Sequence, residues 1–328
     1  MQSLRTFLLT ALAAFALAAC GGGLGTLPPS DPSGSSVEKA TLWVGYDILM
    51  NAFPVTGNGL VTPEATLGTF WSLGTDVPGI VDVAIASDGT RWVLENRSFA
   101  LGGPGWHLYS VAAGESGPMN TYGDNVNEPI ALALGADGVL VAYSDANGTT
   151  TIATYPYGAS NAPAIRTLQI SGPVFGFAVG HLGYLYVARP NRVDIYSPTS
   201  TGCCPVRSIA TFMLPRNLWT GARYFKVGPD NSIYLVDLPG NQANPVMYVN
   251  VYSGDGTLAR RIGPLPANYH GLAWPVITVD AKNRLYVATN DGQIYQFGPS
   301  ANGTDAPQRL MIDPTIGRPA AMAFGPPL

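Results

Sequence analysis

Two adjacent cysteines, Cys203 and Cys204, are the residues of this chain with the most direct covalent chemistry. In an oxidising compartment such a pair can close a vicinal disulfide, or it can remain as two thiols. The sequence leaves both states open. Reactive thiols need an electropositive setting, and this segment provides none, nor a nearby histidine. A clamp within a turn is therefore favoured over a redox or metal pair.

Patterns for other catalytic chemistry are sparse. The three histidines, His107, His181 and His270, are far apart in the sequence. No serine lies in a nucleophile elbow, and no glycine-rich phosphate loop precedes a helix. Aromatic side chains in polar segments rich in glycine and proline instead favour binding, because rings with polar edges stack against sugars or peptides. Packing in the core is the alternative role for these residues, which are Trp71, Trp106, Trp219, Tyr269 and Trp274.

A repeated unit must position these residues. An apolar run, a tight polar turn and a second apolar run recur in six copies, the last of them partial, beginning at Val81, Ile130, Phe175, Tyr224, Val276 and Ala320. The copies lie about 45 to 52 residues apart, which is the period of a propeller blade. Two further runs with two-residue alternation follow each pair, so each repeat predicts four short antiparallel strands. We expect an all-β fold, a six-bladed β-propeller.

The last repeat contains a single apolar run, "RPAAMAFGP", and its missing strands match segments near the other end of the chain. "ATLWVGYD" matches a second strand, "ILMNAFPV" a third and "TPEATLGTF" a fourth. We therefore expect residues 42–46 to pair with residues 320–324, so that one blade contains strands from both ends. Closing the ring in this way protects strand edges that would otherwise invite aggregation.

In a propeller, the turns between second and third strands share one face with the turns that lead from outer strands to the next inner strands. We call this the loop face, and the five aromatic residues above all fall on it. The second strands also end there in polar residues of both charge signs. Solvation can explain such a ring as well as binding can. The polar candidates for the loop face are Glu95, Asp145, Arg189 and Asp237.

The segments "GVLVAYSD", "YLYVARPNRVDIYSP" and "YPYGASNAPAIRTLQI" resemble the repeats of NHL-type six-bladed propellers. The group with these repeats also contains the gluconolactonase-like hydrolases. The resemblance extends over residues 40–328 and implies the ring architecture. It does not select a function, because this ring occurs in binding proteins, scaffolds, lyases and lactonases.

Gluconolactonase-like enzymes hold a divalent cation at the mouth of the axis with oxygen ligands, as a hard cation such as calcium requires. By resemblance, Asp82 and Glu128 lie at inner-strand entrances and could supply carboxylates. The segment "HGLAWP" begins with His270 where the family has asparagine, which departs from the pattern. Lys226 lies on an inner strand opposite Asp82, and we expect the bore to be too wide for an ion pair between them.

The N-terminal segment resembles a bacterial lipoprotein signal. Arg5 precedes the apolar stretch "TFLLTALAAFALAA", and "LAAC" ends at Cys20, the residue that would carry the lipid. An ordinary secretory signal is the alternative. We expect a signal peptide over residues 1–19, a flexible Gly/Pro/Ser tether over 20–39 and the propeller over 40–328. By the same resemblance, Gly21 implies the outer membrane, facing the periplasm or the surface, if the source is Gram-negative.

The formal net charge of −4, without a basic stripe, excludes a typical nucleic-acid partner. We expect membrane contact through the lipid anchor alone. The function predicted from these features is non-catalytic binding or scaffolding at the cell envelope, with a protein, peptide or glycan as partner and without a cofactor. The alternative is a lactonase or esterase that uses a divalent cation held by Asp82, Glu128 and His270.

Overall fold

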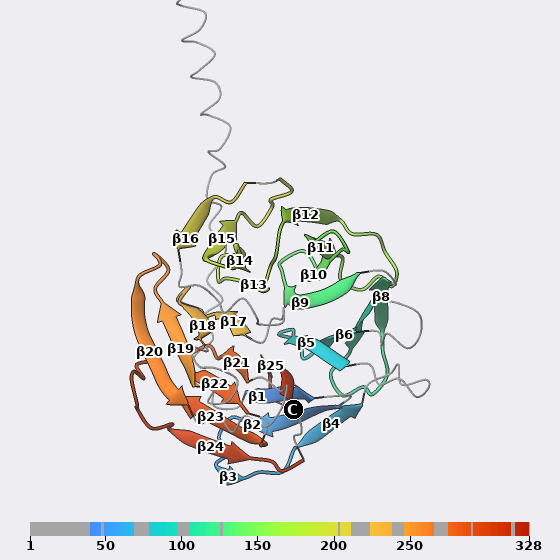
Figure 1. The fold of residues 1–328 in the computed structure, drawn as a ribbon. Helices are drawn as coiled ribbons and strands as arrows, with labels where there is room; N and C mark the ends of the chain where they lie inside the picture. Colours follow the sequence, from blue (N-terminus) through green and yellow to red (C-terminus); the bar gives the residue numbers. More distant parts are fainter. Residues whose placement is uncertain are drawn as a thin grey trace, which may run out of the picture. The chain divides into compact units, whose positions relative to one another are not determined.

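A computed structural model describes residues 40–46, 49–68, 79–96, 105–124, 127–202, 204–210, 224–237, 246–265, 275–289, 291–315 and 319–327. Within them the chain forms six sheets of antiparallel strands around a central axis (Figure 1), which confirms the six-bladed propeller. Among these residues, no helix has the length and apolar character that a membrane crossing requires.

We number the blades in chain order from the first that one continuous segment forms. Blade 1 contains β5 (Gly79–Ile85), β6 (Arg91–Asn96), β7 (Trp106–Val111) and β8 (Asn120–Asp124). Blade 2 contains β9 (Glu128–Leu134), β10 (Val139–Ser144), β11 (Thr149–Tyr155) and β12 (Arg166–Ser171). Blade 3 contains β13 (Gly176–Val179), β14 (Leu185–Arg189), β15 (Arg192–Tyr196) and β16 (Arg207–Ala210).

Blade 4 contains β17 (Phe225–Val227), β18 (Ile233–Asp237), β19 (Met247–Tyr252) and β20 (Leu258–Leu265). Blade 5 contains β21 (Val276–Val279), β22 (Leu285–Ala288), β23 (Gln293–Phe297) and β24 (Arg309–Ile312). Blade 6 begins with β25 (Pro319–Gly325) and continues with β1 (Thr41–Tyr46), β2 (Leu49–Pro54) and β4 (Ala65–Gly68).

Blade 6 closes the ring with strands from both ends of the described chain. Leu42 pairs with Phe324 and Val44 pairs with Met322 in the β1–β25 ladder, as the sequence predicted. Strand β3 (Gly59–Leu60) is an addition that the repeat did not reveal. It leaves blade 6 and pairs in parallel with β24 of blade 5, so it covers part of that outer edge.

Side chains from neighbouring blades repeat this protection of the outer strands. Arg207 of β16 donates to the carbonyls of Gly254 (3.0 Å) and Asp255 (2.8 Å) in the next blade. Arg309 of β24 likewise donates to the carbonyl of Thr56 in blade 6. An outer strand presents unpaired backbone groups, and these contacts fix the following turn against it.

The hydrophobic core lies between adjacent blades. Trp43, Val83 and Tyr109 belong to one cluster between blades 6 and 1. Trp92 and Leu132 belong to another between blades 1 and 2. Middle strands are buried on both faces, whereas outer strands such as β12 alternate between buried and exposed residues. Blades of this kind cannot bury their apolar faces alone, so stacking them around the ring stabilises each one.

Candidate functional site

An ion pair crosses the centre of the ring. Asp82 lies on β5 of blade 1 and Lys226 on β17 of blade 4, with two blades between them on either side. The Lys226 Nζ atom is 3.8 Å from Asp82 Oδ1, and the Asp82 side chain is 2 % exposed. The expectation that the bore is too wide for this pair was therefore wrong.

Small side chains explain why the pair can form. The residues that correspond to Lys226 on the other five inner strands are small, so the long lysine side chain has room to extend across the axis. A β-bulge between Ile80 and Asp82 also re-aims the side chain that follows it. The five residues that correspond to Lys226 are Ala84, Ala133, Ala178, Thr278 and Ala323.

The carboxylate of Asp82 is fully engaged in this arrangement. Its Oδ1 accepts a hydrogen bond from the backbone N–H of Val83 at 3.0 Å, and its Oδ2 accepts one from Leu132 at 3.0 Å. A cation ligand needs these same oxygens. Glu128 is exposed at the start of β9, and His270 lies outside the described residues. In the part of the chain that the structure describes, no group of three potential metal ligands comes together.

Polar residues at the ends of second strands bond to nearby strands, chiefly in their own blades, and Arg189 Nη2 of blade 3 also donates to the carbonyl of Ser171 in blade 2 at 2.6 Å. Tyr109 donates to Glu95 Oε1 at 2.7 Å in blade 1. Arg189 Nη1 lies 3.7 Å from Asp194 Oδ2 in blade 3. In blade 4, Asp237 Oδ2 accepts hydrogen bonds from Asn250 (3.4 Å) and Arg261 (2.9 Å). Each predicted loop-face residue in these blades is thus fixed by a third or fourth strand.

Asp145 has a local role in a turn of blade 2. Its Oδ1 accepts hydrogen bonds from the backbone N–H groups of Asn147 and Thr149, each at 2.9 Å. This is the geometry with which aspartate stabilises tight turns. The contacts position Asp145 at the rim without requiring a ligand.

Glu95 is fully buried and its carboxyl group titrates unusually. Burial raises its pKa from 4.5 to about 7, although the hydrogen bond from Tyr109 acts in the opposite direction. The second carboxyl oxygen, Oε2, has no hydrogen-bond partner. Burial disfavours the charged form of a carboxyl group, so Glu95 stays neutral at acidic pH and loses its proton only near neutral pH.

Among the predicted aromatic residues, Trp106 is fully buried and lies in the core. Its ring stacks at 5.7 Å from Tyr143 and meets the edge of Tyr155 at 5.9 Å. This placement matches the packing alternative for Trp106. Cys204 is exposed, whereas several other predicted residues lie outside the described ranges and keep their status as predictions: Cys20, Trp71, Cys203, Trp219, Tyr269 and Trp274.

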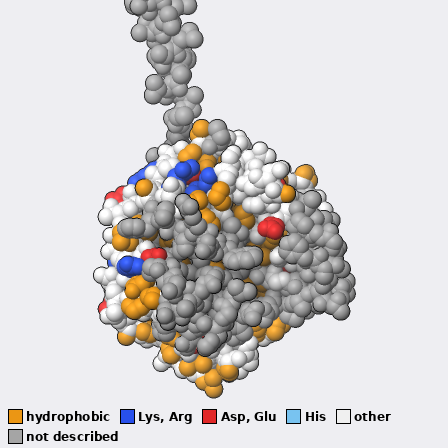
Figure 2. Space-filling view, viewed as in Figure 1, with side chains coloured by type: hydrophobic (Ala, Val, Ile, Leu, Met, Phe, Trp, Pro, Cys, Tyr) orange, Lys and Arg blue, Asp and Glu red, His pale blue; other side chains and the backbone are white. Residues whose placement is uncertain are grey.

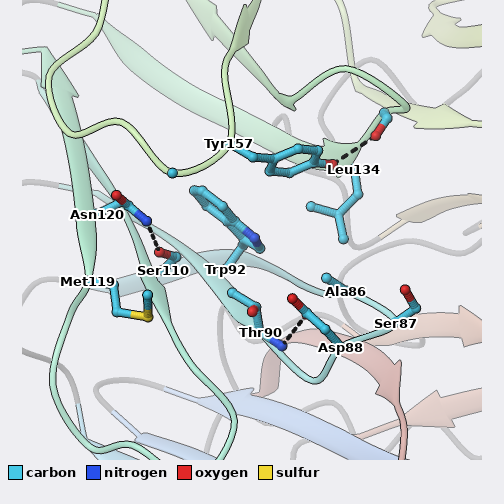
Figure 3. Close-up of a pocket in the computed structure, with 12 residues that line it drawn as sticks. Ala86, Ser87, Asp88, Thr90, Trp92, Ser110, Met119, Asn120, Leu134 and Tyr157 are labelled. Carbon is cyan, nitrogen blue, oxygen red and sulfur yellow. Dashed lines mark hydrogen bonds between the residues drawn. The ribbon is translucent and has the colours of Figure 1, made fainter.

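A cleft of about 570 Å³ lies between blades 1 and 2 on the face opposite the loop face. We call it the inter-blade cleft; its principal lining residues are Asp88, Trp92, Met119, Asn120, Leu134 and Tyr157. Figure 3 shows Tyr157 and Leu134 on one side of Trp92, and Met119 and Asn120 on the other. A smaller cleft of about 410 Å³ lies beyond the same turn, between blades 6 and 1, and includes Trp43 and Arg91.

Figure 2 views the ring in the same orientation as Figure 1 and shows acidic and basic side chains of the described residues in small separate groups. The sequence contains a signal for the inter-blade cleft that the loop-face interpretation did not use. The turn "GADG" of blade 2 is one residue shorter than the corresponding turns of blades 1, 3, 4 and 5.

No family model and no curated protein matches this chain. Solved structures do resemble it. A protein of unknown function from Bacteroides caccae aligns with a TM-score of 0.57 at 10% identity, covering 87% of this chain and 98% of that one. A candidate 6-phosphogluconolactonase from Bacteroides uniformis aligns with a TM-score of 0.56 at 14% identity, covering 88% and 99%. At these identities the likeness shows the fold alone.

Proposed function

We propose that this chain is a non-catalytic binding protein of the cell envelope, a propeller of the NHL-type group tethered by a lipid at Cys20. Its loop face presents aromatic and polar side chains to a protein, peptide or glycan. The proposal rests on the contacts of the Asp82 carboxylate, whose two oxygens bond to Lys226 and to two backbone amides. The axis is stabilised internally, which suits a rigid platform for loops.

The competing proposal, a lactonase or esterase with a divalent cation, needs Asp82 as an oxygen ligand. Binding a cation there would require breaking the contact with Lys226 and turning the carboxylate away from the amides of Val83 and Leu132. Glu95 also fails as a replacement, because its carboxyl group is completely buried and cannot reach a substrate. Binding without chemistry therefore fits the described residues better.

The test uses the detergent-solubilised full-length protein on glycan and peptide arrays. We compare the wild type with Trp219→Ala and Tyr269→Ala, which remove predicted loop-face aromatics, and with Leu182→Ala, which alters an exposed side chain in the β13–β14 turn on the opposite face. The proposal predicts that ligand retention is lost in the first two variants and kept in the third, with thermal unfolding unchanged. Lactone hydrolysis that chelators abolish, together with the same array signal in every variant, would overturn it.

A further inference from the structure

At the inter-blade cleft, a contact that blades 3 and 4 make with the next blade is missing. In blades 3 and 4 the second strand carries a tyrosine whose hydroxyl reaches the turn of the next blade. Tyr186 Oη lies 3.4 Å from Asn231 Oδ1, and Tyr234 Oη lies 3.3 Å from the carbonyl of Asn283. Blade 1 has Trp92 at this position, paired with Ala84 as Tyr186 is with Ala178. An indole has no hydroxyl with which to make that contact.

The blade 2 turn between β9 and β10, which lines the cleft opposite Trp92, is also shorter than its counterpart in blade 4. Four residues, 135–138, separate the paired residues Leu134 and Val139, whereas five, 228–232, separate Val227 and Ile233 in blade 4. Glycine is required within the short turn, because a Cβ atom on Gly138 would collide with the carbonyl of Tyr155. Both differences act at the same gap, and they leave an open volume of about 570 Å³.

Apolar side chains at the cleft are accessible and held in place. Met119 is 59% exposed and Tyr157 is 42% exposed. The Tyr157 hydroxyl donates to the carbonyl of Gly135 at 2.8 Å, and its ring centroid is 5.8 Å from that of Trp92. The exposed ring is therefore oriented before any ligand arrives, which reduces the entropy that binding must overcome. Met119 can adapt its unbranched side chain to different apolar partners.

The charged group that lines the cleft is acidic. Asp88 accepts a hydrogen bond from the backbone N–H of Thr90 at 2.9 Å, and the hydrogen bonds from Thr90 lower its pKa. Asp88 therefore stays ionised near neutral pH. Arg166 of β12 reaches the β9–β10 turn of its own blade, beside the cleft, and pairs there with Asp137 at 3.0 Å. The lining thus combines an apolar surface with a negative charge.

We propose that the inter-blade cleft binds a segment of a partner polypeptide in which an arginine or lysine adjoins an aromatic or aliphatic side chain. The cation pairs with Asp88, and the apolar side chain packs between Met119 and Tyr157. A sugar fits less well, because the Trp92 ring against which it would stack is 2% exposed. This site is separate from the loop face, so it goes beyond the proposed function.

The test measures peptide binding at Met119 directly. Methyl spectra of the methionine-labelled full-length protein are recorded with N-acetyl-Phe-Arg-amide and with N-acetyl-Phe-Glu-amide, and Met119→Leu assigns the signal. We expect the first peptide to shift the Met119 signal saturably and the second to bind about fivefold more weakly, the upper range for an exposed ion pair. Asp88→Asn should remove this preference, because the amide oxygen can still accept from Thr90 while the charge is lost.

Asp230→Asn is the matched control, since Asp230 accepts from the backbone N–H of Ser232 at 2.9 Å in the corresponding turn of blade 4. This variant should bind like the wild type. An unmoved Met119 signal at millimolar peptide, or equal binding of both peptides, overturns the proposal, and a shift produced by chitotriose instead would indicate a glycan site. The peptide experiment reports on Met119 and Asp88 in the cleft, whereas the array experiment varies Trp219 and Tyr269, so failure of this proposal is distinguishable from failure of the loop-face proposal.

Discussion

Lys226 and Asp82 come from opposite blades and meet at the axis, with Lys226 Nζ 3.8 Å from Asp82 Oδ1. Two blades separate them on either side of the ring, so the pair forms only when blades 1 and 4 have been brought to the same axis. The Asp82 side chain is almost completely buried and the Lys226 side chain is mostly buried. Removal of one partner would leave the other charge in the interior without compensation, which is costly.

A double-mutant cycle measures this coupling. We expect Lys226→Met to destabilise the protein by about 3 kcal/mol, because Asp82 is then left buried without its counter-charge. Lys226→Met should cost less when Asp82→Asn is already present, giving a coupling free energy of about 1–3 kcal/mol. Chemical denaturation of the four proteins provides the measurement.

The control for this cycle replaces Lys226→Met with Lys282→Met, which alters a half-buried lysine in the turn between β21 and β22. Its effect should add to that of Asp82→Asn within about 0.5 kcal/mol, as for distant sites. If the effects of Lys226→Met and Asp82→Asn on the free energy of unfolding also add within this margin, the axial pair contributes no stability.

Glu95 predicts a dependence of stability on pH. Burial raises its pKa from 4.5 to about 7 in the folded state, so the folded state binds more protons than the unfolded state between these values. Stability therefore falls as the pH rises through this window and levels off above it. The shift corresponds to about 3 kcal/mol at most. We expect Glu95→Gln, which can still accept from Tyr109, to become more stable than the wild type above pH 7.

Urea denaturation at several pH values between 4 and 8 gives the difference between Glu95→Gln and the wild type. Glu128→Gln is the control, because Glu128 is exposed and the substitution should leave the pH profile unchanged. A constant difference between Glu95→Gln and the wild type across this range would mean that the Glu95 carboxyl group titrates normally.

The repeat period and the matching segments at the two ends predicted the ring and the pairing of Leu42 with Phe324. This succeeded because two-residue alternation and blade length are local properties of the sequence. The axial pair of Asp82 and Lys226 escaped prediction, since it depends on the small residues at five other inner-strand positions and on a bulge. Trp106 illustrates a second limit of prediction from the sequence, because a large aromatic residue near a loop can pack into the core or face the solvent.

The inter-blade cleft was missed for a different reason. It depends on a comparison between blades: Trp92 replaces tyrosine, and the turn after Leu134 is one residue short. Each difference is visible in the sequence once strand register is known. Register assigns Trp92 and Tyr186 to the same position, and periodicity alone does not fix it.

Lipid attachment at Cys20 is the next prediction. Two acyl chains anchor a protein stably, whereas the tether and the acidic body offer no electrostatic attraction to anionic lipid. Cys20→Ser should therefore move the protein from the membrane fraction to the soluble fraction without altering its unfolding transition. Mass spectrometry of the mature N-terminus, with Cys204→Ser as the cysteine control, checks the assignment. A Cys20→Ser protein that remains with the membrane would contradict it.

The metal content of the purified protein tests the binding account most directly against the hydrolase. Full-length protein is incubated with calcium and zinc, dialysed, and measured by inductively coupled plasma mass spectrometry, alongside Asp82→Asn and His270→Ala. With the Asp82 oxygens bonded to Lys226, Val83 and Leu132, we predict only trace metal in all three proteins. Stoichiometric metal in the wild type that is lost in both variants would contradict the account and establish the cation site of the hydrolase.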